Sequence, residues 1–282
     1  MQVKKIAGAL GAEISGLDLS KGVSVTLAAD IRQVFLEHQV IFLRHQDLNP
    51  AQFLAFAQAM GQPIEYPFVK GIEGFPHIIE VKKLAHEKAN FGGIWHSDTT
   101  YLDVPPMGSM LLAKVVPPYG GDTLFANQYL AYDTLSDTMK GVLAGLRGIS
   151  SSAKADVSKT REDRIKTDGK GDGKGEGAAA APQQFQALHP IVRTHPETGR
   201  KALYVNVAHT AGIDGMTDAE SAPILNFLFA HQVKPEFTCR FVWAPHSLAF
   251  WDNRCAQHNP VNDYHGHLRL MHRITLQGDT PV

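Results

Sequence analysis

Three apolar stretches near the C-terminus decide the fold: FTCRFVW at residues 237–243, SLAFW at 247–251 and LRLMHRITL at 268–276. Each is short, contains β-branched or aromatic residues and is bounded by polar or proline-containing segments, which is the pattern of consecutive strands. Helical spacing of apolar residues occurs mainly earlier in the chain. Helices early and strands late predict a mainly β protein of the α+β class, with a sandwich or barrel core and helices packed around it.

The segments that precede these strands supply further elements. VIFL at residues 40–43 is a wholly apolar run that suits a buried strand. Apolar residues recur at helical spacing over residues 27–35, and Thr26 is the candidate N-cap. Asparagine followed by proline at residues 49–50 predicts the start of a second helix. TDAE at residues 217–220 is a capping box that opens a later one.

The composition is that of an ordinary globular protein. Of the 282 residues, 44% are hydrophobic and 20% are charged, and the formal net charge is −1, so no basic field is present to attract nucleic acid. No apolar run approaches the roughly 20 residues of a membrane span, and no apolar signal core follows the first residues. Cys239 and Cys255 are too few for a disulfide framework and suit the reducing cytoplasm, where we expect the protein.

We expect the whole chain, residues 1–282, to form one domain. Residues 153–183 differ from the rest, because they include a run in which glycine alternates with charged residues, followed by alanines. Such a run cannot bury enough apolar surface to order itself, which predicts a flexible loop inserted between core strands. The loop is either a solvated linker or a lid over an active site.

The first candidate for chemistry is WHSD at residues 95–98. If this segment is a strand, His96 and Asp98 project from one face, because they are two residues apart. Another histidine, His258, follows the WDNR segment at residues 251–254. Two imidazoles and one carboxylate on one face of a metal leave the opposite face open, which suits iron(II) with a chelating co-substrate and oxygen. The plainer interpretation of WHSD is a surface strand with two polar residues.

The last predicted strand brings two arginines together. By strand alternation Arg269 and Arg273 lie on one face, where burial would require anionic partners. Arginine binds a carboxylate bidentately in a way that lysine cannot. Thr123, in the GGDT turn at residues 120–123, could donate a hydrogen bond to the same carboxylate. The alternatives are an exposed strand face with two solvated arginines and a plain hairpin turn.

Together these motifs resemble the taurine/2,4-D (TauD/TfdA) family of iron(II)/2-oxoglutarate-dependent dioxygenases. The spacing of the proposed ligands and arginines agrees with the family pattern, and the resemblance runs nearly end to end. The matching stretches are GAEISG (11–16), HQVIFLR (38–44), WHSD (95–98), GGDT (120–123), HPIVRTHP (189–196), and WDNR (251–254) continuing through His258 to Arg273. The resemblance therefore implies both a fold and a set of site residues.

The implied fold has a double-stranded β-helix (jelly-roll) core. The implied metal ligands are His96, Asp98 and His258, while Arg269 and Thr123 hold the distal carboxylate of 2-oxoglutarate. The cofactor and co-substrates are then iron(II), 2-oxoglutarate and O2. The reaction hydroxylates the substrate, and 2-oxoglutarate gives succinate and carbon dioxide. If the hydroxylated carbon bears a sulfonate, sulfate ester or aryl ether, the product collapses and releases that group.

Arg273 matches the arginine that in several members meets the anionic group of the substrate. Iron(II) with one aspartate ligand, together with Arg269, offsets the dianionic co-substrate, so Arg273 is left over for a further anion. The implied substrate is a small sulfonate, sulfate ester or aryloxyalkanoate-like carboxylate.

Alignment with the family suggests four further substrate-binding positions: Tyr66, Val69, Gly92 and His209. Taurine-cleaving members carry a histidine, a tyrosine and an asparagine at the first three, and an aromatic ring is usual at the fourth, so the differences count against taurine itself. KGIEGFP at residues 70–76 and GMTDAES at residues 215–221 look more like the aryloxyalkanoate-cleaving members.

Two rival functions stay open. A jelly roll with the same three ligands could hold zinc and hydrolyse its substrate, or the chain could bind a small anion without catalysis. The zinc alternative leaves Arg269 and Thr123 unexplained. Family members commonly form dimers or tetramers, so the resemblance also implies a homo-oligomer. Apart from other copies of the chain, we expect the protein to bind a small anionic molecule and not nucleic acid or membrane.

Overall fold

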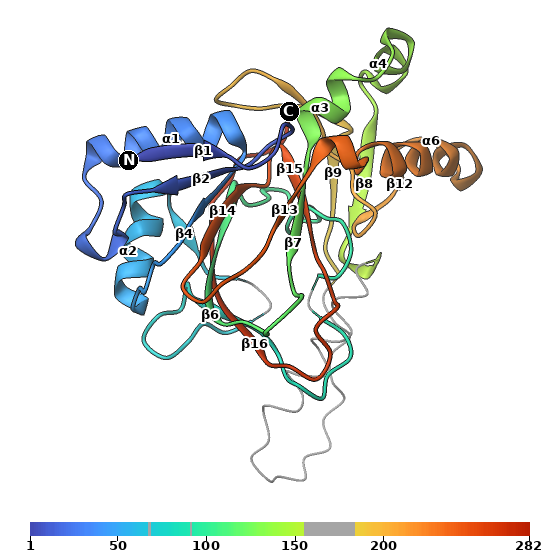
Figure 1. The fold of residues 1–282 in the computed structure, drawn as a ribbon. Helices are drawn as coiled ribbons and strands as arrows, with labels where there is room; N and C mark the ends of the chain where they lie inside the picture. Colours follow the sequence, from blue (N-terminus) through green and yellow to red (C-terminus); the bar gives the residue numbers. More distant parts are fainter. Residues whose placement is uncertain (67–68, 91, 155–183) are drawn as a thin grey trace.

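The computed structural model describes residues 1–66, 69–90, 92–154 and 184–282 (Figure 1). The segment expected to be a linker or a lid, residues 153–183, falls outside the described residues except for its first two. Both interpretations of that segment, and the expectation of a single domain over the whole chain, therefore stay predictions.

An eight-stranded sheet forms the larger part of the core. Its neighbouring strands are antiparallel except for the parallel pair β2–β3. In spatial order it contains β1 (Gln2–Lys5), β2 (Ala12–Ser15), β3 (Val40–Leu43), β14 (Leu248–Asp252), β6 (Gly108–Val115), β16 (Arg269–Leu276) and β4 (Pro63–Ile64), and β5 (Ile79–Lys83) also pairs with β16. Two of the three predicted C-terminal strands, β14 and β16, thus lie inside this sheet.

A three-stranded antiparallel sheet faces the large one and contains, in order, β13 (Thr238–Phe241), β7 (Thr123–Asn127) and β15 (Ala256–Pro260). Aromatic side chains fill the space between the two sheets. The ring of Phe42 stacks on Phe241 with centroids 4.0 Å apart and meets Phe125 edge-on at 5.6 Å, geometries that stabilise beyond the buried area alone. Two facing antiparallel sheets of this kind form the jelly-roll core, and the predicted fold class is confirmed.

Helices α1 (Val25–His38) and α2 (Pro50–Met60) cover the outer face of the large sheet (Figure 1). Strand β3 shows why its sequence is wholly apolar. Ile41 and Leu43 pack into the core under the helices, whereas Val40 and Phe42 pack into the core between the sheets. A strand buried on both faces has no polar side.

Local capping sets where these two helices begin. The Ser24 hydroxyl accepts a hydrogen bond from Leu27 N–H at 3.2 Å and starts α1. The prediction that Thr26 is the cap is wrong, because Thr26 already lies in the first helical turn. In α2 the prediction is confirmed: Asn49 accepts from Gln52 N–H at 2.9 Å, and Gln52 in return accepts from Asn49 N–H at 3.0 Å.

The remaining helices and strands gather on the other side of the small sheet, and most of them contribute to a separate apolar cluster (Figure 1). They are α3 (Gln128–Asp133), α4 (Asp137–Leu143), α6 (Asp218–His231), β8 (Arg147–Ser151), β9 (Gln186–Pro190), β12 (Thr210–Ile213), β10 (Val192–Thr194) and β11 (Lys201–Leu203), with short 3-10 turns at Ser152–Lys154 and Pro235–Phe237. A further 3-10 turn, Leu19–Lys21, packs instead beside α2 on the outer face of the large sheet. Helix α6 opens at the predicted capping box, where the Glu220 carboxylate accepts from Thr217 N–H at 2.8 Å.

A buried ionic network fixes the turn between β14 and β15. Asp252 accepts hydrogen bonds from Arg254 Nη2 at 2.7 Å and from His195 Nε2 at 3.0 Å. Arg254 also pairs with Glu197, which in turn pairs with Arg32 of α1. Removal of one buried member would leave an uncompensated charge, so substitution of Asp252 or Arg254 alone is expected to destabilise this turn.

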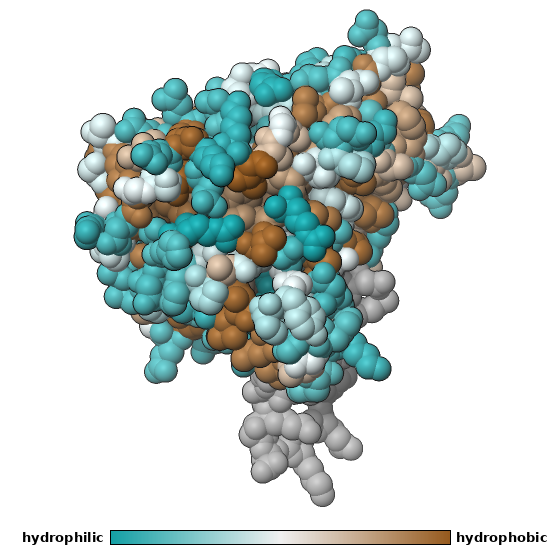
Figure 2. Space-filling model, in the orientation of Figure 1, coloured by the Kyte–Doolittle hydropathy of each residue, from teal (hydrophilic) through white to brown (hydrophobic). Residues whose placement is uncertain are grey.

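Among the described residues, no helix has the length and apolar character needed to cross a membrane. Polar and apolar residues are interspersed on the face seen in Figure 2. The exposed large apolar side chains, Val25 and Val242 among them, come from different parts of the chain. Scattered exposure of this kind needs no functional explanation.

Candidate functional site

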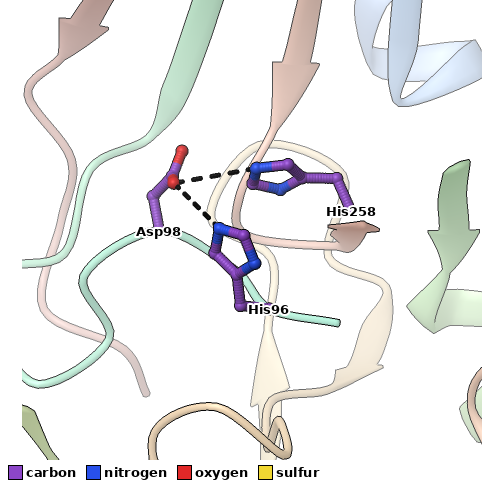
Figure 3. A group of neighbouring side chains, drawn as sticks. All are labelled: His96, Asp98 and His258. Atoms are coloured by element: carbon purple, nitrogen blue, oxygen red, sulfur yellow. Dashed lines mark ion pairs between the residues drawn. The ribbon is translucent and has the colours of Figure 1, made fainter. Parts of the chain in front are cut away.

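Three of the residues predicted from the sequence meet in one buried group. Asp98 Oδ1 lies 3.7 Å from His96 Nε2 and 3.8 Å from His258 Nε2 (Figure 3). One ligand atom from each residue lies within 4.8 Å of the other two, and all three residues are buried. Three ligand atoms gathered around a common point can hold one metal ion.

A turn rather than a strand brings His96 and Asp98 together. His96 forms an isolated bridge with His258 of β15, in which each backbone N–H donates to the other residue's carbonyl, at 3.0 and 2.8 Å. Asp98 already lies in a turn, and its N–H donates to Asn253 Oδ1 at 3.3 Å. The next residue, Thr99, has φ +43°, a left-handed conformation that is rare for a β-branched side chain. The predicted strand geometry is therefore wrong, although the two side chains do meet.

The environment of His96 and His258 favours the neutral imidazoles that a metal ion needs as ligands. Burial lowers the pKa of His96 and that of His258 below the ordinary histidine value. His96 Nδ1 lies 2.7 Å from the carbonyl of Ile94. Because a carbonyl only accepts, Nδ1 carries the proton and Nε2 keeps its lone pair. Two neutral imidazole nitrogens with one carboxylate are the donor set that fits iron(II) in a facial triad.

The carboxylate of Asp98 stays ionised although it is buried. Burial alone would raise its pKa, but Arg273, the two imidazoles and a hydrogen bond from Ser109 outweigh burial and hold the pKa below its ordinary value. Arg273 Nη2 lies 2.8 Å from Asp98 Oδ2, and Ser109 Oγ donates to the same oxygen at 2.6 Å. The protein therefore holds Oδ2, and Oδ1 is the oxygen that faces the imidazoles.

Gly92 leaves room for the ring of His96. A Cβ at this position would lie 2.8 Å from His96 Cε1 and 3.2 Å from His96 Nε2. Its φ of +72° is also one that side chains other than hydrogen rarely tolerate. Gly92 thus borders the candidate metal group directly.

A pocket opens beside the three residues, between the two sheets. Its lining consists of Val81, His96, Leu111, Thr123, Trp243, Trp251, His258, Pro260, Arg269 and Arg273. As predicted, the two arginines project from the same face of β16. Aromatic and aliphatic walls with a few convergent polar groups are usual for a small-molecule site.

Arg269 brings unused hydrogen-bond donors to this pocket. Its side chain is buried and its Cζ lies 5.7 Å from the ring centre of Trp243. Neither its Nε nor its Nη2 finds an acceptor in the described part of the chain. Trp243 Nε1 donates to Thr123 Oγ at 3.0 Å, so the Thr123 hydroxyl keeps its own proton to donate. A buried guanidinium without acceptors is costly, and a ligand carboxylate would supply the acceptors that it lacks.

Arg273 was expected to have no anionic partner within the protein, but the structure gives it one. Its Nη2 is ion-paired with Asp98, and its Cζ lies 5.3 Å from the ring centre of Tyr66. Its Nε, however, has no acceptor among residues that the structure describes. One part of the guanidinium is therefore committed to the aspartate, and another part is available to a ligand.

His209 lies beside the metal group, with its ring centre 6.0 Å from that of His96 and 5.0 Å from that of Tyr101. Its Nδ1 is 3.0 Å from Thr100 Oγ, which accepts from Asn206 Nδ2 at 3.2 Å. Burial, reinforced by His96, lowers the pKa of His209 to about 3, so its ring is neutral. His209 thus ties its own loop to the turn that follows Asp98.

Of the predicted substrate residues, only Arg273 belongs to the described lining of the pocket. Tyr66 does not line the pocket itself, but its ring lies against the Arg273 guanidinium, which does. Val69 is half-buried and is not part of the lining. Two further residues of the site, Ser109 and Asn253, were not predicted from the sequence. Asn253 stands inside the WDNR motif, which is a signal that could have found it. Ser109 has no local signal.

A second group of potential metal ligands, His195, Asp252 and Cys255, is also buried. Asp252 there already accepts from His195 and, through three bonds of 2.7 to 2.9 Å, from Arg254. A cation at this place would lie against a guanidinium. Burial raises the pKa of the Cys255 thiol well above its ordinary value, which disfavours the thiolate that a metal needs. This group is therefore structural.

Comparison with known proteins gives a consistent result. Residues 2–275 match the model of the family described as taurine catabolism dioxygenase TauD, TfdA family. The chain is 32% identical to the alkylsulfatase of Acinetobacter baylyi (99% of this chain, 86% of that protein) and 30% identical to the alpha-ketoglutarate-dependent sulfate ester dioxygenase of Pseudomonas putida (100% and 91%). A crystal structure of a taurine dioxygenase from Burkholderia xenovorans is similar with a TM-score of 0.81 at 34% identity, covering 100% of this chain and 92% of that one. Alpha-ketoglutarate and 2-oxoglutarate are the same compound.

Proposed function

Because this chain belongs to the TauD/TfdA family of dioxygenases, we propose that it hydroxylates a small anionic organic substrate, with a sulfate ester as the first candidate. The chain is an iron(II)- and 2-oxoglutarate-dependent dioxygenase, an oxidoreductase that uses O2. One observation carries the substrate proposal. Arg273 lies against Asp98 of the candidate metal group while its Nε, in the pocket, has no acceptor among the described residues.

The metal ligands in this proposal are Nε2 of His96, Nε2 of His258 and Oδ1 of Asp98. When bound, iron(II) would activate O2, which is the oxidant, and 2-oxoglutarate would supply two of the four electrons that O2 accepts, giving succinate and carbon dioxide; the substrate supplies the other two. The chain's own part is to keep the imidazoles neutral, to keep the carboxylate ionised and to leave the remaining face of the site free.

The distal carboxylate of 2-oxoglutarate is assigned to Arg269 and Thr123. The guanidinium offers Nε and Nη2, the pair that can meet a carboxylate bidentately. The Thr123 hydroxyl adds a further donor, because Trp243 Nε1 already occupies one of its lone pairs. The carboxylate of the co-substrate would also offset the electrostatic cost of burying the Arg269 cation.

The anionic group of the substrate is assigned to Arg273. The Tyr66 ring supports the guanidinium, and Asp98 occupies only its Nη2 side. With a metal ion held at Oδ1, the charge of Asp98 would be shared with that ion, so the positive charge of Arg273 would be available to a second anion. Tyr66 and His209 are proposed to stand beside the substrate, whereas Val69 and Gly92 carry this role from the sequence alone.

A sulfate ester is the first candidate to test because relatives named for alkyl sulfate or sulfate ester chemistry match almost the entire chain, although relatives named for sulfonate and 2,4-dichlorophenoxyacetate chemistry match it to a similar extent. Hydroxylation of the carbon that bears the sulfate group gives a product that decomposes without further help. The hydroxyl loses its proton, the bond between that carbon and the sulfate oxygen breaks, and sulfate leaves with the electron pair. The carbon, already oxidised by the hydroxylation, is left as an aldehyde. Sulfonates and aryloxyalkanoates would fragment in the same way.

Turnover of three substrate classes tests the proposal. Purified protein with iron(II), 2-oxoglutarate and O2 is supplied with an alkyl sulfate, an alkanesulfonate or an aryloxyalkanoate, and succinate is measured together with sulfate, sulfite or phenol. We expect one sulfate per succinate with the alkyl sulfate. The variant Arg273→Lys keeps the positive charge but loses the planar guanidinium that binds an anion through two hydrogen bonds. Its KM for the anionic substrate should therefore rise more than its KM for 2-oxoglutarate. Equal turnover of an uncharged alkyl analogue would contradict the assignment.

We also propose a homo-oligomer, dimer or tetramer, located in the cytoplasm. The oligomer is supported by the dimers and tetramers that are common among family members. The cytoplasmic location is consistent with Cys239 and Cys255 being buried and unpaired. Light scattering coupled to size-exclusion chromatography measures the oligomer directly, and a monomer at micromolar concentration would contradict it.

A further inference from the structure

Ser109 lies on the inner face of β6 and is completely buried. Its hydroxyl donates to Asp98 Oδ2 at 2.6 Å and accepts from Asn253 Nδ2 and Arg273 Nη2, both at 3.2 Å. A hydroxyl has one proton to donate and two lone pairs. An amide NH2 group and a guanidinium can only donate, and they occupy both lone pairs. The proton of Ser109 is therefore left with one direction, toward Asp98.

The orientation of the Asn253 amide is fixed by its own partners. Its Oδ1 accepts from the Asp98 N–H at 3.3 Å and from Trp251 Nε1 at 2.9 Å. With the oxygen engaged on that side, the NH2 group faces Ser109. The backbone and the carboxylate of Asp98 are thus held by one connected set of buried groups.

We propose that Ser109 is a positioning residue that makes Asp98 a one-oxygen metal ligand. This inference rests on the proposed assignment of His96, Asp98 and His258 as ligands. Because Ser109 and Arg273 hold Oδ2, only Oδ1 faces the imidazole nitrogens. A carboxylate that turned to offer both oxygens would take an additional position on the metal. A chelating co-substrate and O2 need every position that a facial triad leaves open.

Metal binding by four forms of the full chain tests this role: wild type, Ser109→Ala, Ser109→Cys and Ser247→Ala. Ser247 is the matched control, because it is equally buried beside the other end of β6 and its hydroxyl accepts from Arg44. Cysteine preserves the side-chain volume with a weaker donor, so this variant carries the test if the alanine variant fails to fold. The apoproteins are titrated with Mn(II), followed by the electron paramagnetic resonance signal of the free ion. Anaerobic titration with iron(II) and 2-oxoglutarate then reports the visible charge-transfer band of the chelate.

We expect Ser247→Ala to bind Mn(II) as wild type does. Ser109→Ala should bind it about 10- to 100-fold more weakly, with Ser109→Cys between the two, and both Ser109 variants should show a shifted or weakened band. Equal affinity and an equal band in the Ser109 variants and in Ser247→Ala would overturn the inference but leave the ligand assignment standing. Failure of the wild type to bind Mn(II) would overturn the ligand assignment, and the inference with it.

Discussion

Arg273 Nη2 lies 2.8 Å from Oδ2 of Asp98, the carboxylate oxygen held away from the two imidazoles. The guanidinium thus touches a proposed metal ligand and the proposed substrate site at the same time. Loss of this residue must act on both, since the substrate anion loses its partner and Asp98 loses a charge that holds its pKa down. The two arginines of β16 therefore differ in role, because Arg269 lies against Trp243 instead.

The variant Arg273→Gln is expected to lose metal binding at a higher pH than wild type does. Burial raises the pKa of Asp98, and Arg273 is the foremost of the groups that oppose it. Without Arg273 the pKa rises, so protons compete with the metal at pH values where the wild-type carboxylate is still ionised. Mn(II) affinity measured from about pH 5 to about pH 8 shows the shift. Parallel pH profiles in variant and wild type would exclude this role of Arg273.

Arg269→Met is expected to leave the apoprotein as stable as wild type, or more stable, while the response to 2-oxoglutarate is lost. Methionine fills the same space without a buried charge, and two guanidinium nitrogens of Arg269 lack acceptors among the described residues. In the presence of Mn(II), 2-oxoglutarate should raise the Tm of wild type by mass action. Each lost charge-assisted hydrogen bond is worth about 1.5–3 kcal/mol of binding.

Thermal unfolding with and without 2-oxoglutarate measures both effects of Arg269→Met. Arg200→Met is the control, because Arg200 is exposed and pairs with Asp133. A lower Tm of the apoprotein combined with an undiminished response to 2-oxoglutarate would show that Arg269 is structural.

Gly92→Ala is expected to weaken metal binding, whereas Gly74→Ala is not. The two glycines have nearly the same φ, +72° and +74°, so both substitutions carry a similar backbone cost of about 1–2 kcal/mol. A Cβ at Gly74 meets no atom within 4 Å, but a Cβ at Gly92 would lie 2.8 Å from His96 Cε1. Mn(II) titration of both variants therefore separates the contact from the backbone strain. Equal losses of affinity would mean that the contact with His96 has no importance.

Stability of the apoprotein is expected to depend on pH in part through His209. Burial lowers its pKa from the ordinary 6.5 to about 3, so between these values the unfolded chain binds one proton more than the folded chain. The contribution of the neutral ring is complete above pH 6.5 and is lost as the pH falls toward 3. His209→Phe removes this term and should reduce the slope of the unfolding free energy against pH by up to about 1.4 kcal/mol per pH unit.

Urea unfolding at several values from about pH 5 to about pH 7 measures the slope for His209→Phe and for wild type. The exposed His86 provides the control variant, His86→Gln. The same slope in wild type and His209→Phe would contradict the expectation.

Features that depend on local patterns were predictable from the sequence. The run of four apolar residues in β3 predicts a strand that is buried on both faces, as the structure shows. The period of two along β16 places Arg269 and Arg273 on one face, and the capping box of α2 is contained in four consecutive residues. Each of these features is decided by neighbours in the chain, so the residues themselves carry the information.

Features that depend on distant contacts were not predictable. Ser24 and Thr26 offer similar hydroxyls two residues apart, and the sequence does not distinguish which of them accepts the hydrogen bond that caps α1. Asp98 meets His96 through a turn whose partner Asn253 lies 155 residues away, rather than through a strand. Ser109 shares a hydrogen bond with the same Asn253 across 144 residues. Only the packing of the two sheets brings these groups together.

Anaerobic titration of the purified apoprotein with iron(II) and 2-oxoglutarate is the most direct test of the proposed metal and co-substrate sites. In wild type we expect a weak visible charge-transfer band, from iron chelated by 2-oxoglutarate at His96, Asp98 and His258, and we expect this band to be lost in His96→Ala. Iron binding without the band would contradict the roles of Arg269 and Thr123 and would return the zinc-dependent and non-catalytic alternatives to consideration.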